Sequence, residues 1–169
     1  LWINDKQPLV INLYRELRRS ASAVVKLLRQ FESDPDKKAA FYRHREMMRD
    51  GSRTERAARF VFLNRNCFRG IFKAKTELAA YTHGGECAAL EPYCERLLAM
   101  GAYLRRHVRS HDEITCRDLF DVLDEADPER DFIVADPPYF QMKGNEYVDY
   151  TEDGFAPELH DRLNEALAG

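Results

Sequence analysis

Apolar residues recur every three or four positions over most of the chain, the spacing that places side chains on one face of a helix. The first such stretch begins at Pro8, a residue favoured at the start of a helix, and continues through Leu9, Leu13 and Leu17. Short apolar runs, partly β-branched, interrupt this spacing and predict strands. The predicted strands are at 1–3, 114–116 and 131–135, and the predicted helices are at 8–17, 21–31, 37–49, 53–64, 92–109, 119–126 and 157–167.

Predicted strands and helices alternate at the two ends of the chain, whereas the middle is helical. Such alternation is typical of an α/β fold with a parallel sheet. We therefore predict an α/β domain built from residues 1–36 and 110–169, with a mainly helical insert at residues 37–109.

The composition fits one globular domain, because 44% of the 169 residues are hydrophobic and 33% are charged. No apolar run reaches the length of a membrane span, so we expect no membrane association. The four cysteines form no C-x-x-C pair, which predicts reduced thiols and a cytoplasmic protein. His83, Cys87 and Cys94 match no zinc-ligand spacing, and we therefore predict no metal site.

Charge is unevenly distributed, although the net charge is only −3. Residues 42–75 carry ten Lys and Arg against three Asp and Glu, with four phenylalanines among them. Residues 111–169 show the opposite balance, with 17 acidic and 4 basic side chains. A solvated helix face is the simple explanation of such a run. Cations interleaved with aromatic rings favour a phosphate-facing surface instead.

The most informative stretch is residues 131–139, Asp-Phe-Ile-Val-Ala-Asp-Pro-Pro-Tyr, where a predicted strand ends at the carboxylate of Asp136. Pro137 and Pro138 prevent a strand or helix from continuing. Ligands of open α/β sheets bind beyond the carboxyl ends of the strands. A carboxylate, a stiff backbone and the ring of Tyr139 at that place suit a planar ligand that carries an amino group. The alternative is a strand followed by an ordinary Pro-Pro turn.

This Asp-Pro-Pro-Tyr segment resembles the catalytic motif of S-adenosylmethionine-dependent methyltransferases that modify exocyclic amino groups of DNA bases. Other segments occur in the order found in the Dam-type (D12 class) DNA adenine-N6 methyltransferases and resemble them. These segments are residues 3–14, 57–70, 116–120 and 150–155. The resemblance implies a partial Rossmann-like methyltransferase sheet with an inserted, mainly helical segment that recognises DNA.

The resemblance also implies roles for particular residues. The implied catalytic residues are Asp136, Pro137, Pro138 and Tyr139, and the implied S-adenosylmethionine-binding residues are Asp5, Asp118, Leu119 and Asp136. Asp5 would accept hydrogen bonds from two ribose hydroxyls, although capping statistics alone favour a helix cap at this position. Asp136 would accept a hydrogen bond from the amino group of a flipped adenine, on which Tyr139 would stack.

The segment that follows the helix at 53–64 resembles the DNA-contacting hairpin of the family. The residues expected to contact DNA are Arg65, Phe68, Arg69, Ile71, Lys73 and Lys75. Family members that read GATC usually carry Asn before the glycine and Arg three residues after it, where this chain has Arg69 and Lys73. Lys offers a point charge and Arg a bidentate fork, so recognition of GATC does not follow from the resemblance.

The family's glycine-rich cofactor loop is expected about twenty residues before Asp5, and further strands are expected after Tyr139. The sequence contains neither, so we expect an inactive, marginally stable fragment of a monomeric bacterial or phage enzyme. Its expected partners are double-stranded DNA and S-adenosylmethionine. Two alternatives remain open: a methyltransferase for another amino group, such as cytosine N4 or RNA adenine, and a non-catalytic DNA-binding remnant. A glutamine-modifying enzyme is disfavoured, since those relatives typically carry Asn before Pro-Pro.

Overall fold

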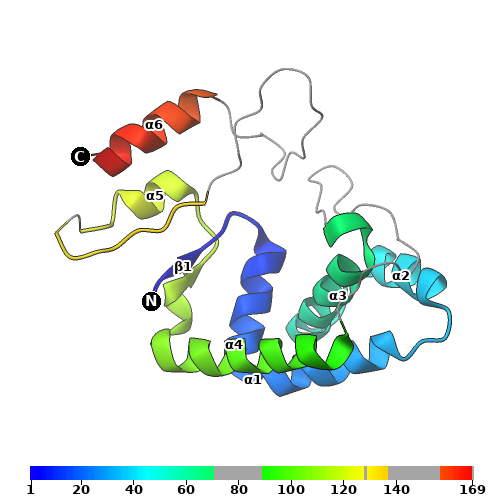
Figure 1. The fold of residues 1–169 in the computed structure, drawn as a ribbon. Coiled ribbons are helices and arrows are strands. Elements are labelled where there is room, and N and C mark those ends of the chain that lie inside the picture. The colour runs from blue at the N-terminus through cyan, green and yellow to red at the C-terminus, as the bar shows by residue number, and fades with distance from the viewer. Residues whose placement is uncertain (71–88, 128, 137–156, 169) are drawn as a thin grey trace.

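The computed structural model describes residues 1–70, 89–127, 129–136 and 157–168. Helices dominate this part of the chain, and two short strands lie together at one end of the helical region (Figure 1). The elements are β1 (Ile3–Asn4), α1 (Pro8–Glu32), α2 (Lys37–Glu46), α3 (Arg53–Asn66), the 3-10 helix η1 (Phe68–Gly70), α4 (Leu90–His107), the 3-10 helix η2 (His111–Glu113), β2 (Ile114–Thr115), α5 (Leu119–Leu123) and α6 (Pro157–Ala168).

The helices predicted from apolar spacing are confirmed, with ends shifted by a few residues. The helices predicted at 8–17 and 21–31 are two parts of α1, which bends at Ser20, where φ is −160° and ψ is 76°. In Figure 1, α1 changes direction and then continues beside α4. Among the helices of the described residues, none is long and apolar enough to cross a membrane.

The core is built mainly from α1, with α3 and α4 packed against it. Val24 and Leu28 of α1, Phe62 of α3 and Leu104 of α4 are all fully buried there. Each apolar side chain buried in this way contributes about 1.5–3 kcal/mol to folding. α1 lies before the predicted insert, and α3 and α4 lie within it. Because all three helices share one core, the predicted boundary at residue 37 does not separate two packing units. The division into catalytic and recognition parts stays a functional prediction.

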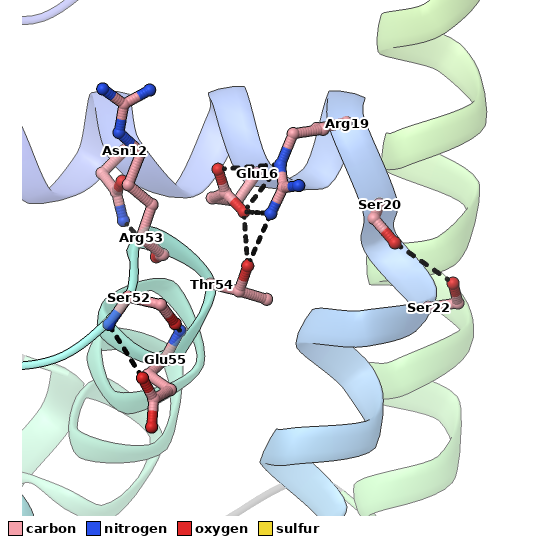
Figure 2. A network of polar contacts seen from close by, with 9 residues as sticks. All are labelled: Asn12, Glu16, Arg19, Ser20, Ser22, Ser52, Arg53, Thr54 and Glu55. Atoms are coloured by element: carbon pink, nitrogen blue, oxygen red, sulfur yellow. Dashed lines mark hydrogen bonds and ion pairs between the residues drawn. The ribbon is translucent and has the colours of Figure 1, made fainter.

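A buried carboxylate joins α1 to the start of α3 (Figure 2). Glu16 is 2% exposed and accepts hydrogen bonds from Arg19 Nη2 at 2.6 Å and from the Thr54 hydroxyl at 2.7 Å. Burial raises the pKa of Glu16, but these hydrogen bonds and nearby positive charge outweigh it and hold the pKa below its usual value. Ser52 and Glu55 form a capping box at the same helix start, so α3 is fixed at its N-terminus by polar contacts.

The two strands form a parallel pair, with Ile3 opposite Ile114 and Asn4 opposite Thr115. The helical core lies between them in the sequence, so a helical crossover joins the strands as parallel pairing requires. Asp5 directly follows β1, and its backbone N–H donates to the Thr115 carbonyl at 3.3 Å. Asp5 therefore lies at the carboxyl edge of the pair.

The strand predicted at 131–135 is wrong for this structure. Residues 131–136 have no regular secondary structure, and Phe132 is 92% exposed. A strand buries its side chains only where neighbouring strands pair with it and other elements cover its faces. Within the described part of the chain, β1 pairs with β2 and no strand pairs with residues 131–136. The apolar side chains of this segment are therefore mostly exposed instead of buried.

Candidate functional site

A cavity of about 1150 Å³ runs along the two strands and includes their carboxyl edge: Asp5 and Leu119, which follow the strands, line it, and so do Trp2 and Glu113, which precede them. Its walls come from the end of β1, from α5, from residues 131–136, and from the second half of α3 together with η1. Open α/β sheets bind their ligands at this place. Ligand pockets commonly measure about 300–1,000 Å³, so the cavity is large enough for a nucleoside-sized ligand and part of a second molecule.

Asp5 contributes a carboxylate to this cavity. Its Oδ1 accepts a hydrogen bond from the Gln7 N–H at 2.7 Å. The helix cap of α1 is Gln7, whose side chain accepts from the Leu9 N–H, so Asp5 is not the cap that capping statistics favour. Burial raises the pKa of Asp5 and the bond from Gln7 lowers it, with burial the larger effect. The structure thus holds a partly buried carboxylate at the strand end.

Asp118 and Leu119 follow β2 at the start of α5. Leu119 lines the cavity. Asp118 caps α5 by accepting from the Phe120 N–H at 3.0 Å, and it forms an ion pair with Lys6 Nζ at 3.7 Å. Lys6 lines the cavity next to Asp5. Asp118 is therefore linked to the cavity wall through Lys6, while its main local role is to start the helix that carries Leu119.

Asp136 lines the cavity from the 131–136 segment and is exposed. The structure consequently brings Asp5, Leu119 and Asp136, which are far apart in the sequence, around one cavity. Pro137, Pro138 and Tyr139 lie outside the described residues, so the roles expected of them stay predictions.

Arg65, which the sequence predicts to contact DNA, is packed between three helices in the structure. Its side chain is 7% exposed, its Nε donates to Glu32 Oε1 at 3.2 Å, and its guanidinium lies 4.5 Å from the centroid of the Tyr93 ring. These contacts join α1, α3 and α4. Arg59, from the same basic stretch, is also buried and donates to the Met47 carbonyl at 2.9 Å. Part of the predicted phosphate-facing charge therefore serves packing.

The other expected DNA contacts belong to the end of α3 and beyond. Phe68 is 47% exposed on η1, and Arg69 is the next residue of the same turn. Gly70 ends the turn and lines the cavity. The remaining expected contacts, Ile71, Lys73 and Lys75, lie outside the described residues.

Two asparagines at the site were not singled out from the sequence. Asn4 accepts hydrogen bonds from the Thr115 hydroxyl at 2.8 Å and from the Arg117 N–H at 3.1 Å, and so ties β1 to the segment that follows β2. Asn64 Nδ2 donates to the Gly70 carbonyl at 2.8 Å. Both asparagines line the cavity. Asn4 ends a strand and Asn64 lies near the end of a helix. These positions are the one sequence signal that could have indicated a place in the site.

A parallel strand pair with a ligand-sized cavity and carboxylates at its carboxyl edge is compatible with the class of α/β methyltransferases. The chain belongs to the D12 class N6 adenine-specific DNA methyltransferase family, whose family model matches residues 1–169. This match confirms the family that the Asp-Pro-Pro-Tyr segment and its neighbours indicate.

Three DNA or type II methyltransferases are similar to this chain in sequence. A DNA N-6-adenine-methyltransferase of Escherichia phage P1 is 32% identical over 164 residues, which are 95% of this chain and 21% of that protein. The type II methyltransferase M1.LlaDCHI of Lactococcus lactis is 26% identical, over 98% of this chain and 59% of the relative. The type II methyltransferase M.MjaIII of Methanocaldococcus jannaschii is 27% identical, over 68% of this chain and 38% of the relative. The chain thus spans between about a fifth and three fifths of these relatives.

Proposed function

We propose that the protein containing this chain is a site-specific DNA methyltransferase that transfers a methyl group from S-adenosylmethionine to the N6 amino group of adenine in double-stranded DNA. One observation carries the proposal: in a chain of the D12 class family, Asp5, Leu119 and Asp136 line a single cavity that includes the carboxyl edge of parallel strands. In this proposal, β1 and β2 are part of a Rossmann-like methyltransferase sheet.

The chemistry of the cavity fits the methyl donor. Asp5 is held at the strand end by the Gln7 N–H, where its carboxylate can accept hydrogen bonds from two ribose hydroxyls. Leu119 and Val122 of α5 offer apolar surface to a planar base. Asp118 orients this helix and pairs with Lys6, so it supports the same wall. When bound, S-adenosylmethionine supplies a methyl group on a positively charged sulfur.

Asp136 is the proposed catalytic carboxylate. The lone pair of the adenine N6 atom is delocalised into the ring, which makes that nitrogen a poor nucleophile. Asp136 accepts one amino N–H, and a backbone carbonyl near Pro137 accepts the other. Both interactions strengthen as positive charge develops on nitrogen, so they favour the transition state over the ground state. Asp136, directly or through a water molecule, then takes the released proton.

Target recognition is proposed to involve the end of α3 and the segment after it. The adenine must leave the duplex to reach Asp136, and Tyr139 is proposed to stack on it. Arg65 is left out of the proposed DNA contacts, because Glu32 and Tyr93 surround its guanidinium. The proposed contacts are Phe68, Arg69, Ile71, Lys73 and Lys75.

The test is Asp136→Ala in the full-length protein. Methylation of duplex DNA should fall by about a hundred- to a thousandfold, the scale of losing a charge-stabilising group in a transition state. Binding of S-adenosylmethionine, measured by calorimetry, should remain measurable. The matched control is Asp124→Ala, because Asp124 is an exposed aspartate at the end of α5 that does not line the cavity.

Wild-type turnover in the Asp136→Ala variant would show that this carboxylate is not catalytic. DNA binding by the wild-type protein without any binding of S-adenosylmethionine would instead support the non-catalytic remnant. Methylation of RNA or of cytosine in preference to DNA adenine would replace the proposed substrate while leaving the role of Asp136 intact.

A further inference from the structure

The η1 turn, Phe68–Gly70, starts from a firmly packed base at the end of α3. Cys67 is 3% exposed, and its thiol donates to the Asn64 carbonyl at 3.3 Å. Asn66 is buried, and its side-chain amide donates to the Phe62 carbonyl at 2.8 Å. Cys67 gives the turn its fixed start, whereas Asn66 bonds within α3 and to Glu32 of α1 and makes no bond to the turn.

One side chain extends from this base across the turn. Asn64 Nδ2 donates to the Gly70 carbonyl at 2.8 Å, and the Gly70 N–H donates to the Cys67 carbonyl at 3.3 Å. Gly70 has a φ of +66°, a left-handed conformation that glycine adopts without steric cost. The Asn64 bond therefore holds the Gly70 carbonyl and, with it, the end of the turn.

The same hydrogen bond lies at the cavity wall. Asn64 and Gly70 both line the cavity that Asp5 and Asp136 line. Phe68, at the other end of the turn, is 47% exposed and faces solvent. The Asn64 amide therefore links the cavity to a turn whose first side chain, Phe68, is about half exposed.

We infer that Asn64 is a positioning residue for target recognition, which holds the η1 turn against the cavity so that sequence reading and methyl transfer occur on the same adenine. This inference rests on the proposed function and deepens it. Asn64 acts through the Gly70 backbone rather than on the reacting atoms. Its loss should therefore change which sites are methylated and leave donor binding unchanged.

The test uses the full-length protein with Asn64→Ala and Asn64→Asp, the second of which keeps the size of the side chain but places a carboxylate against the Gly70 carbonyl. Each variant methylates a duplex DNA library with randomised positions, and sequencing that detects N6-methyladenine gives the preferred site. The ratio of kcat/KM between the preferred site and sites with one mismatch should fall about tenfold, the scale of one hydrogen bond to an oriented group. Binding of S-adenosylmethionine should stay within a factor of two of wild type.

The matched control is Asn66→Ala. Asn66 lies on the same helix and also bonds to a backbone carbonyl, but it faces Glu32 in the core and not the cavity. This variant should lower the midpoint of unfolding while leaving the site preference unchanged. Hydrogen exchange gives a second readout, because residues 68–70 should exchange faster in Asn64→Ala and not in Asn66→Ala.

A glycine pair tests the same turn if both Asn64 variants fail to fold. Gly70→Ala strains a left-handed residue in the turn, whereas Gly51→Ala strains the left-handed residue between α2 and α3, with φ of +77°. Only the first should alter the site preference.

An unchanged site preference in the folded Asn64 variants, or in Gly70→Ala where those variants do not fold, would overturn the inference and leave the proposed function standing. An equal change in the Asn66→Ala control would also overturn it, because the effect would then reflect general loosening of α3. A wild-type protein that methylates no DNA would refute the proposed function, and the inference with it.

Discussion

Phe62 in α3 and Phe132 before the proposed catalytic aspartate have opposite surroundings. Phe62 is fully buried among α1, α3 and neighbouring rings, with the Phe31 ring centroid 6.2 Å away. Phe132 is 92% exposed beside the cavity. The helical core is packed from three long helices, α1, α3 and α4, whereas the cavity side relies on two strands of two residues each. Stability and the proposed chemistry are thus located in different parts of the chain.

The largest expected effect tests this separation directly. Phe62→Ala should lower the free energy of unfolding by about 3–5 kcal/mol, because it removes a buried aromatic ring and leaves a cavity. Phe132→Ala should change it by less than about 0.5 kcal/mol, as is usual for exposed positions. Urea unfolding of the full-length protein measures both values. Equal losses in the two variants would show that residues 131–136 are packed after all.

A second, smaller effect is expected at the polar link between α1 and α3. Glu16→Gln should cost about 1–3 kcal/mol, since it weakens charge-assisted bonds from Arg19 and Thr54 in a buried place. Because the folded pKa of Glu16 is lowered, its contribution is fully present above the ordinary glutamate pKa of about 4.3 and is lost as pH falls through the folded pKa.

The control for this pH effect is Glu95→Gln, which changes an exposed glutamate of α4. Unfolding measured between neutral and acidic pH should show a weaker acid dependence in Glu16→Gln alone. The same acid dependence in wild type and Glu16→Gln would assign the loss of stability to other carboxylates.

The sequence predicts the helical core well because its signals are local. Apolar spacing, Pro8 at the first turn and the Ser52 capping position determine helices from residues a few places apart. Even the bend of α1 falls at Ser20, between the two predicted helices.

The sequence predicts the cavity side less well because its contacts are distant. A strand forms only where a partner is present, and the apolar run at 131–135 contains no information about that partner. The burial of Arg65 could not be predicted for a related reason: a basic side chain looks the same in a sequence whether it faces phosphate or Glu32, and only packing decides. Asn64 was missed because its partner, Gly70, lies beyond the helix end, where helical spacing no longer applies.

The smallest expected effect is a change in stability at Asp5, and its sign is opposite to that expected at Glu16. Asp5 at the cavity has a raised pKa, chiefly from burial, whereas Glu16 in the core has a lowered one. A raised carboxyl pKa means that the folded state binds the proton more tightly than the unfolded state. The cost to stability appears as pH rises from the ordinary aspartate pKa, about 3.9, and is complete above the folded pKa.

Asp5→Asn removes this cost while its side-chain oxygen can still accept from the Gln7 N–H. The variant should therefore unfold at slightly higher urea than wild type at neutral pH and show no gain under acidic conditions, where wild-type Asp5 is protonated. In the full-length protein it should bind S-adenosylmethionine at least about tenfold more weakly, since an amide accepts only one of the two ribose bonds well. Lower stability together with unchanged donor binding would mean that Asp5 is a structural residue. The expected result, a gain in stability with a loss of binding, is the behaviour of a carboxylate kept at the strand end for a ligand rather than for the fold.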